Sequence, residues 1–309
     1  MKSIIRKILL GNATISEYST VTVNEHAIPE KVYLQAGNSR IDISSLHWIL
    51  CLEPLVFGVW LTKDADIQWL KKAKNSKIYF TDHAKKIVAV VTTTTTGSIE
   101  ENDGILFLLT LQKSRIFHIN FIKAHFIFER YYKKPGLSYN KLKAFAAAYS
   151  YPRKVRVVSY KDGDYFNIFP MDLVGDISQN NRFVFGLRHT NVTLKKIIGT
   201  QKLVISEVPF TAKPLIYELG KHHSSSLLSA TELPFGLLTS HHFKFPVPGF
   251  ANAYKEIRII KNIDLGSHML LWGEVLHSEK LNEAEGHLFH IHFLHYLHQK
   301  NNGYQYRLV

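Results

Sequence analysis

Residues Tyr151–Phe210 read YPRKVRVVSYKDGDYFNIFPMDLVGDISQNNRFVFGLRHTNVTLKKIIGTQKLVISEVPF, and this stretch decides the fold of the chain. Its apolar runs are short, rich in β-branched and aromatic residues, and bounded by Gly, Asn and Asp, as is typical of strands joined by turns. After the run RFVFGL comes a polar corner, Arg188–Asn191, and then a short helix that Gly199 can terminate. The stretch therefore predicts paired strands followed by one short helix.

A weaker copy of this layout occurs earlier in the chain. The run IPEKVYLQAGNSRIDISS, which begins at Ile28, parallels the run that begins at Tyr151, and EPLVFGVWL parallels NRFVFGLRH. In both copies Val-Phe-Gly is followed by a polar corner, a Leu-Lys-Lys segment and an apolar run, KIYF or KLVIS. The shared order favours an internal duplication over the alternative that any two strand–turn–helix segments look alike.

The rest of the chain has the same strand chemistry and few helices. We expect strands at 86–96, 104–111, 115–129 and 267–276, and helices at 138–150, where Ser138 can cap, and at 214–220. The predicted fold is mostly β with short helices: two β-barrels in tandem. The segment Lys133–Gly136 is a plausible joint, which divides the chain into domains 1–134 and 135–309.

The composition narrows the function classes. The 309 residues are 46% apolar, as in a globular protein, and carry a net charge of +13 spread over both halves. The single cysteine, Cys51, excludes an internal disulfide framework and a zinc site built from cysteines, and fits a reducing, cytoplasmic setting. No apolar run is long enough to cross a bilayer, so no membrane partner is expected. An evenly basic surface suits nucleic acid or an anionic cofactor.

The corner after RFVFGL has the chemistry of a phosphate site. The amides of a helix start, its dipole and the Arg188 guanidinium would attract a dianion. Hydroxyl and amide groups at Thr190, Asn191 and Thr193 would add donors. The alternative is an ordinary capped helix at the surface. The matching corner of the first copy carries Asp64 and Asp66, which would repel a phosphate.

The segment FNIFPMDLVG, residues 166–175, suggests a ring-binding loop. It offers one amide at Asn167, an apolar platform at Phe169, Pro170 and Met171, and one acid at Asp172. Ligand pockets combine such apolar walls with few orienting polar groups. A planar ring with a phosphorylated tail would suit this loop beside the corner. The alternative is a hairpin loop that buries its aromatic residues.

Taken together, these residues resemble the flavin reductase-like family of FMN-binding split barrels. The similarity runs through Arg153–Phe210 and, more weakly, through the Lys221–Ser226 loop to GSHMLLWGEVLHSEKL near the C-terminus. It implies a tandem split-barrel protein with a degenerate first copy, FMN as cofactor and NAD(P)H as possible co-substrate. Such proteins are commonly homodimers with FMN near the interface, so the resemblance implies that this chain acts as an intrachain pseudo-dimer, with further assembly into a homo-oligomer left open. The resemblance and the corner together give the candidate cofactor-binding residues Asn167, Phe169, Pro170, Met171, Asp172, Leu173, Arg188, His189, Thr190, Asn191 and Thr193.

The implied activity is that of an NAD(P)H-dependent flavin reductase, with hydride transfer to the bound FMN. No catalytic residue is assigned, because the cofactor carries the chemistry. Two alternatives stay open: a flavin carrier or sensor without turnover, and a nucleic-acid-binding β-barrel protein. The basic residues lack the regular interleaving with aromatic residues that favours nucleic acid.

Histidines are concentrated near the C-terminus in HLFHIHFLHYLH, residues 287–298. On a strand, His290 and His292 would share a face, whereas on a helix His295 and His298 would be neighbours. No spacing pattern fixes a metal geometry, so we assign no metal and expect polar positions on a β-segment. By family analogy, His223 would approach the flavin.

Overall fold

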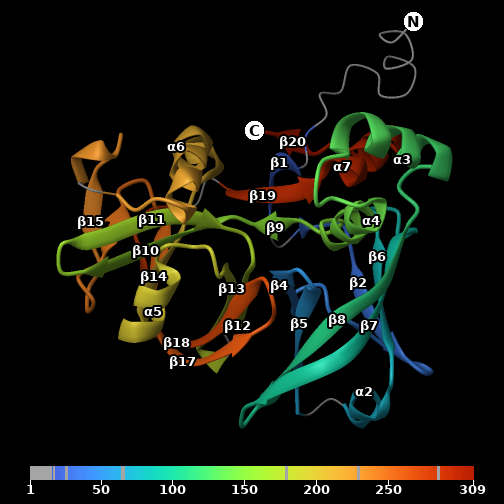
Figure 1. Ribbon diagram of the computed structural model, residues 1–309, viewed down its shortest axis with the longest axis horizontal. Coiled ribbons are helices and arrows are strands. Elements are labelled where there is room, and N and C mark those ends of the chain that lie inside the picture. The colour runs from blue at the N-terminus through green and yellow to red at the C-terminus, as the bar shows by residue number, and fades with distance from the viewer. Residues whose placement is uncertain are drawn as a thin grey trace, which may run out of the picture.

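The computed structural model describes residues 16, 18–24, 27–63, 67–177, 180–227, 230–283 and 286–309. Within them the chain is mostly β, as predicted, and two seven-stranded sheets form two split barrels with short helices at their edges. Figure 1 shows the sheets side by side, with α4 and β9 near their junction. None of the helices in these ranges is long and apolar enough to span a membrane.

The first sheet is wholly antiparallel and has the order β3-β2-β6-β7-β8-β5-β4. Its strands are β2 (Val32–Ala36), β3 (Ser39–Asp42), β4 (His47–Leu52), β5 (Leu55–Thr62), β6 (Ser76–Thr81), β7 (Ile87–Glu100) and β8 (Gly104–Ile116). The threonine run lies within β7, where β-branched side chains suit a pleated surface.

The second sheet repeats this order strand for strand, as β11-β10-β14-β17-β18-β13-β12. Its strands are β10 (Arg156–Asp162), β11 (Tyr165–Met171), β12 (Val174–Ile177), β13 (Arg182–Arg188), β14 (Lys202–Glu207), β17 (Ala253–Asp264) and β18 (His268–Lys280). A common order is what an internal duplication predicts. The shared ancestry of the two halves stays a prediction.

Two small sheets complete the β-structure. One has the order β20-β1-β19-β9, and the other is the pair β15–β16. Their strands are β1 (Tyr18–Val23), β9 (Arg153–Lys154), β19 (His287–His292), β20 (Arg307–Leu308), β15 (Leu237–Thr239) and β16 (Pro246–Pro248). Because β1 pairs with β19 along its whole length, a strand of the first half and a strand near the C-terminus lie in one sheet.

The helices are short. The α-helices are α2 (Gln68–Lys72), α3 (Phe121–Ile127), α4 (Tyr139–Ala148), α5 (Leu194–Thr200), α6 (Lys213–Glu218) and α7 (Phe293–Asn301). A π-helix spans Phe128–Tyr132, and 3₁₀ turns span Phe210–Ala212, Leu219–His223 and Ala230–Glu232. The Ser138 side chain caps α4 by accepting the Lys141 amide, which confirms the predicted helix start.

The strand that we expected at 115–129 is wrong. Strand β8 ends at Ile116, and Asn120 caps α3 by accepting the amide of Lys123. The buried residues Ala124, Ile127 and Phe128 recur at helical rather than alternating spacing. In part of this segment every second residue is apolar, which is the pattern of a strand. The prediction followed that pattern instead of the helical spacing of the residues that are buried.

The expectation that the C-terminal histidines share a β-segment is also wrong in part. Strand β19 ends at His292, and both His295 and His298 lie in α7. The ring of His295 lies 3.0 Å from buried Glu30, and that of His298 lies 3.0 Å from Asp82. The two rings therefore belong to contacts that attach α7 to the first half.

Packing contacts cross the expected joint near residue 134, and the division into domains 1–134 and 135–309 stays a prediction. Helix α4, which we placed at the start of the second domain, packs against β7 and β8 of the first sheet. Its buried residues Ala144, Ala147 and Ala148 belong to the main hydrophobic core. Together with the β1–β19 pairing, this places a first-half helix after the expected joint and a first-half strand beside the C-terminus.

The two halves pack closely where β4 lies against β12 and β13. A Cβ atom added at Gly186 would lie 1.8 Å from the backbone oxygen of Leu50, so only glycine allows this approach. The rings of Trp60 and Trp272 stack across the same contact with centroids 5.9 Å apart. The junction is therefore an apolar core shared by both halves.

Candidate functional site

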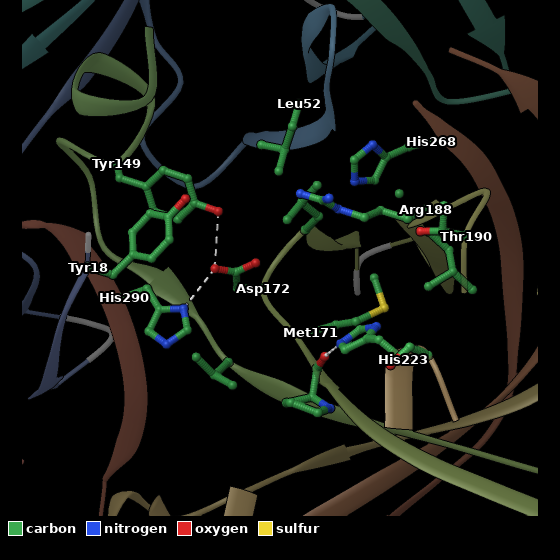
Figure 2. Close-up of a pocket in the computed structure, with 16 residues that line it drawn as sticks. Tyr18, Leu52, Tyr149, Met171, Asp172, Arg188, Thr190, His223, His268 and His290 are labelled. Carbon is green, nitrogen blue, oxygen red and sulfur yellow. Dashed lines mark hydrogen bonds and ion pairs between the residues drawn. The ribbon is translucent and has the colours of Figure 1, made fainter. Parts of the chain in front are cut away.

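A cavity of about 520 Å³ lies between the two halves. Its size falls within the usual range for small-molecule pockets. Figure 2 shows Arg188 and His268 on one side of it, and Tyr18, Tyr149 and His290 on the other. The lining residues are Tyr18, Leu52, Tyr149, Val155, Pro170, Met171, Asp172, Leu173, Gly186, Leu187, Arg188, Thr190, His223, Ser224, His268 and His290.

The cationic side of the cavity is Arg188, the last residue of β13. Its side chain is exposed, and within the described ranges no acid lies at ion-pair distance from its guanidinium. Thr190 follows in the turn after the strand and also lines the cavity. An unpaired guanidinium beside a hydroxyl is suited to bind an anionic group.

The helix that follows offers fewer donors than we expected. The Asn191 side chain accepts the Thr193 amide at 2.8 Å, and the Leu194 amide donates to the Asn191 backbone oxygen. The Asn191 and Val192 amides donate to the backbone oxygens of Arg188 and His223. These amides are therefore unavailable to a ligand. Asn191 and Thr193 are buried, and their hydrogen bonds hold the turn that follows Arg188.

The predicted ring-binding loop is in fact a strand, because Phe166–Met171 lie in β11. Pro170 and Met171 line the cavity at the end of this strand, followed by Asp172 and Leu173. Asn167 and Phe169 are wholly buried, and neither lines the cavity. Side chains alternate between the two faces of a strand, so the segment cannot present all of its residues to one ligand.

Some predicted cofactor-binding residues do not line the cavity and instead bond to residues next to it. The Asn167 amide donates to the Thr193 hydroxyl and to the His222 backbone oxygen, both at 2.8 Å. His189, which we also assigned to the cofactor, pairs with Asp264 at 3.2 Å and does not line the cavity. Of the predicted residues, the cavity brings together Pro170, Met171, Asp172, Leu173, Arg188 and Thr190.

His223 lines the cavity, and its approach to a flavin stays a prediction. Its Nε2 lies 2.7 Å from the Pro170 backbone oxygen, which can only accept, so this nitrogen carries the proton. Nδ1 then accepts from the Asn191 side-chain amide at 3.0 Å. Burial, and secondarily the charge of Arg188, lowers the pKa of His223 below its usual value. The ring is therefore a neutral, fixed part of the wall.

The opposite side of the cavity was missed by sequence reasoning. Asp172 Oδ2 accepts from His290 Nδ1 at 2.8 Å and from the Tyr149 hydroxyl at 3.2 Å. The other ring nitrogen of His290 lies 2.8 Å from the Tyr217 hydroxyl. Tyr18 stacks on His290 with ring centroids 5.7 Å apart. Asp172 alone was predicted, since its partners come from distant segments.

Asp172 is held in its charged form by these contacts. Burial by itself would raise the pKa of its carboxyl, but His290, Tyr149 and Arg153 together keep the pKa below the usual value. Burial and the charge of Asp172 raise the pKa of Tyr149 well above its usual value. The site therefore pairs an ionised carboxylate with a neutral phenol.

His268 lies beside Arg188 at the start of β18. Burial, with the nearby charges of Arg188 and His189, lowers the pKa of His268 to about 4. Its Nδ1 lies 2.8 Å from the Ser267 hydroxyl and 3.7 Å from the Cys51 sulfur. At neutral pH the ring is uncharged, so it does not repel Arg188.

A second cavity of about 560 Å³ lies at the same junction and is more polar. Lys154 and Arg156 contact Glu207 there, at 3.0 and 3.7 Å. Burial alone would raise the pKa of Glu207, but Arg156 and Lys154 outweigh it and bring the pKa to about 2. Three of its cations, Lys154, Arg156 and Lys255, already have acidic partners. The fourth, Arg153, is buried and donates to the backbone oxygens of Ala148 and His47. This cavity is therefore less suited than the first to an anionic ligand.

This pairing predicts a pH dependence of stability. The pKa of Glu207 falls from 4.5 to about 2 on folding, so its stabilisation is present above pH 4.5 and is lost as the pH falls towards 2. Between about pH 5 and about pH 3 the wild type should lose ~2 kcal/mol more unfolding free energy than Glu207→Gln. Urea unfolding of both proteins at the two pH values measures this. Equal losses would contradict the pairing.

The matching corner of the first half cannot be compared in full. Strand β5 ends at Thr62 and α2 begins at Gln68. Asp64 and Asp66, which we expected to exclude a phosphate, lie outside the described residues. Their effect on anion binding stays a prediction.

Comparisons with known proteins give likenesses among solved structures. No family model matches the chain, and no curated protein matches it. An FMN-binding protein from Thermus thermophilus, solved with bound 1-cyclohex-2-enone, is 22% identical over 42% of this chain and 71% of its own, with a TM-score of 0.37. The Streptomyces globisporus C-1027 NADH:FAD oxidoreductase SgcE6 is 15% identical over 50% of this chain and 90% of its own, at 0.44. BorF, the flavin reductase component of a bacterial two-component tryptophan halogenase, is 13% identical over 46% and 89%, at 0.41.

Proposed function

We propose that this chain binds FMN in the cavity between its halves and acts as an oxidoreductase of the flavin reductase type. The observation that carries the proposal is an apolar cavity wall facing a guanidinium without an acidic partner among the described residues. A planar ring with an anionic tail matches this combination. The two halves of one chain would supply the site as a pseudo-dimer, in a cytoplasmic protein.

The residues present fit such a cofactor. Arg188 and the Thr190 hydroxyl would hold the phosphate, since both line the cavity on its cationic side. Pro170, Met171 and Leu173 would contact the ring. Asp172 Oδ1 makes no hydrogen bond with a described residue and offers an acceptor for a ring N–H.

The chemistry that a bound flavin supplies is hydride uptake from a reduced nicotinamide and delivery of the electrons to a second acceptor. The chain's own residues bind and orient. Leu52 and Val155 line the cavity with apolar side chains, which would keep water from part of the bound cofactor. The hydrogen bonds of Asp172 to His290 and Tyr149 fix the direction of its carboxylate. The neutral ring of His223 is fixed by its bond to Pro170.

Absorbance spectroscopy tests the proposal. The purified chain, after addition of FMN and removal of the excess, should retain an absorbance band near ~450 nm at about one flavin per chain. Without retained flavin, the assignment of the cavity is wrong. Purified chain denatured in parallel controls for adsorption of free flavin.

Turnover separates an enzyme from a flavin carrier or sensor. We expect the FMN-loaded chain to oxidise NADH or NADPH when an electron acceptor is present, because a bound flavin would take up hydride from a reduced nicotinamide. A chain that retains FMN but oxidises neither nucleotide with any acceptor would be the carrier. Binding and turnover thus have distinguishable outcomes.

A further inference from the structure

Three histidines gather on the second half, apart from the cavity. His241 and His242 lie in the turn between β15 and β16, and His277 lies on β18. One ring nitrogen from each of the three lies within 4.8 Å of the other two. In Figure 1, β15 lies at the outer side of the second half. Long-range folding, rather than a sequence motif, brings these three imidazoles together.

The rings are packed face to edge and face to face. The His241 and His242 centroids are 4.4 Å apart, and that of His277 lies 4.9 and 5.2 Å from them. His241 and His242 are exposed and His277 is half-buried. Modest rotations of the exposed rings would therefore bring three nitrogens to the spacing of a common ion.

The turn that carries His241 and His242 is held in place by its backbone. Glu256 accepts the amides of His242 and Phe243, with distances of 2.7–3.0 Å. The Tyr254 hydroxyl accepts the His241 amide at 3.0 Å. Both partners lie on β17, next to β18 in the sheet. Such outer contacts fix the position of metal ligands before an ion binds.

A carboxylate lies beside the three histidines and contacts one of them. Glu279 Oε2 lies 3.6 Å from His277 Nε2, and the Tyr254 hydroxyl donates to the same oxygen. His277 Nε2 itself is buried and makes no hydrogen bond with any residue that the structure describes. A buried acceptor nitrogen without a donor is a position that an ion would satisfy.

We propose that His241, His242 and His277, with Glu279, bind a divalent transition metal ion such as Zn²⁺. Imidazole nitrogen with one carboxylate is a donor set for zinc, nickel or copper, whereas Mg²⁺ and Ca²⁺ prefer all-oxygen sites. The ion would tie the β15–β16 turn to β18 and so stabilise this edge of the second half. The proposal is independent of flavin binding.

Zn²⁺ titration of the full, untagged chain by calorimetry tests the site. We expect one saturable Zn²⁺ equivalent, and His277→Gln should raise its dissociation constant at least tenfold. His242→Gln should do the same while leaving the half-buried strand residue intact. The matched control is His125→Gln, since His125 is an exposed ring on α3, and it should leave the constant unchanged. Co²⁺ added in place of Zn²⁺ should give visible d–d bands that both site variants lose.

Circular dichroism on each variant shows whether it is folded. The proposal is overturned if the wild type binds no saturable Zn²⁺, or if all three variants bind it with the wild-type constant. A variant that loses Zn²⁺ binding with an unchanged spectrum supports it. If His277→Gln is unfolded, His242→Gln decides, because His242 is exposed in a turn.

Discussion

Replacing Gly186 by alanine is expected to lower the free energy of unfolding by at least about 3 kcal/mol. The added Cβ would lie 1.8 Å from the Leu50 oxygen and 2.6 Å from its carbonyl carbon. Both are backbone atoms of β4, so no side-chain rotation can relieve the overlap. The halves would have to separate, and the apolar core between them would open. Urea unfolding followed by circular dichroism measures the loss.

The matched control is Gly199→Ala. Gly199 lies in α5, and a Cβ there would meet no heavy atom within 4 Å. Alanine is the better helix former by about 0.5–1 kcal/mol, so this variant should equal or exceed the wild type. If Gly186→Ala were as stable as wild type, the close approach of β13 to Leu50 would be wrong.

Arg188→Ala is expected to weaken FMN binding by about 1.5–3 kcal/mol, roughly 10- to 150-fold in the dissociation constant. In the proposed complex the guanidinium would be the charged donor to the phosphate, and its loss would remove a charge-assisted hydrogen bond. Because this exposed side chain has no acidic partner in the described residues, the melting temperature should not change. Flavin fluorescence quenching measures the affinity.

Arg258→Ala is the control for charge alone. Arg258 is 54% exposed on β17, pairs with Glu274 and does not line the cavity. Its removal lowers the net charge equally and should leave FMN affinity within about twofold. Arg188→Lys, which keeps the charge but not the planar fork, should fall between wild type and alanine. Unchanged affinity in Arg188→Ala would place the phosphate elsewhere.

Much of the fold was predictable because its signals are local. Short β-branched runs predicted β10, β13, β7 and β18, and a capping serine predicted α4. The strand expected at 115–129 failed for a local reason too, since helical and alternating periods coincide over a few residues. The repeated order of segments predicted two sheets of the same strand order.

The site was predictable only in part. Arg188 and Thr190 follow directly from the end of β13, where the chain must leave the sheet. Asn167 and Phe169 lie in a strand, are buried and do not line the cavity, so their contact with a cofactor stays a prediction. The helix amides were misassigned because Asn191 accepts one of them, and a capping side chain and a phosphate compete for the same donors.

The sequence by itself determined the short strands, the polar corner at Arg188 and the similarity of two Val-Phe-Gly segments. Only the tertiary structure shows that the glycines of these two segments, Gly58 and Gly186, have different surroundings. A Cβ at Gly58 would meet the movable side chain of Leu50, whereas one at Gly186 would meet the Leu50 backbone. It also brought Tyr18, Tyr149 and His290 to Asp172. Local propensity acts through neighbours in the chain, whereas these contacts join distant segments and arise only when the two halves pack together.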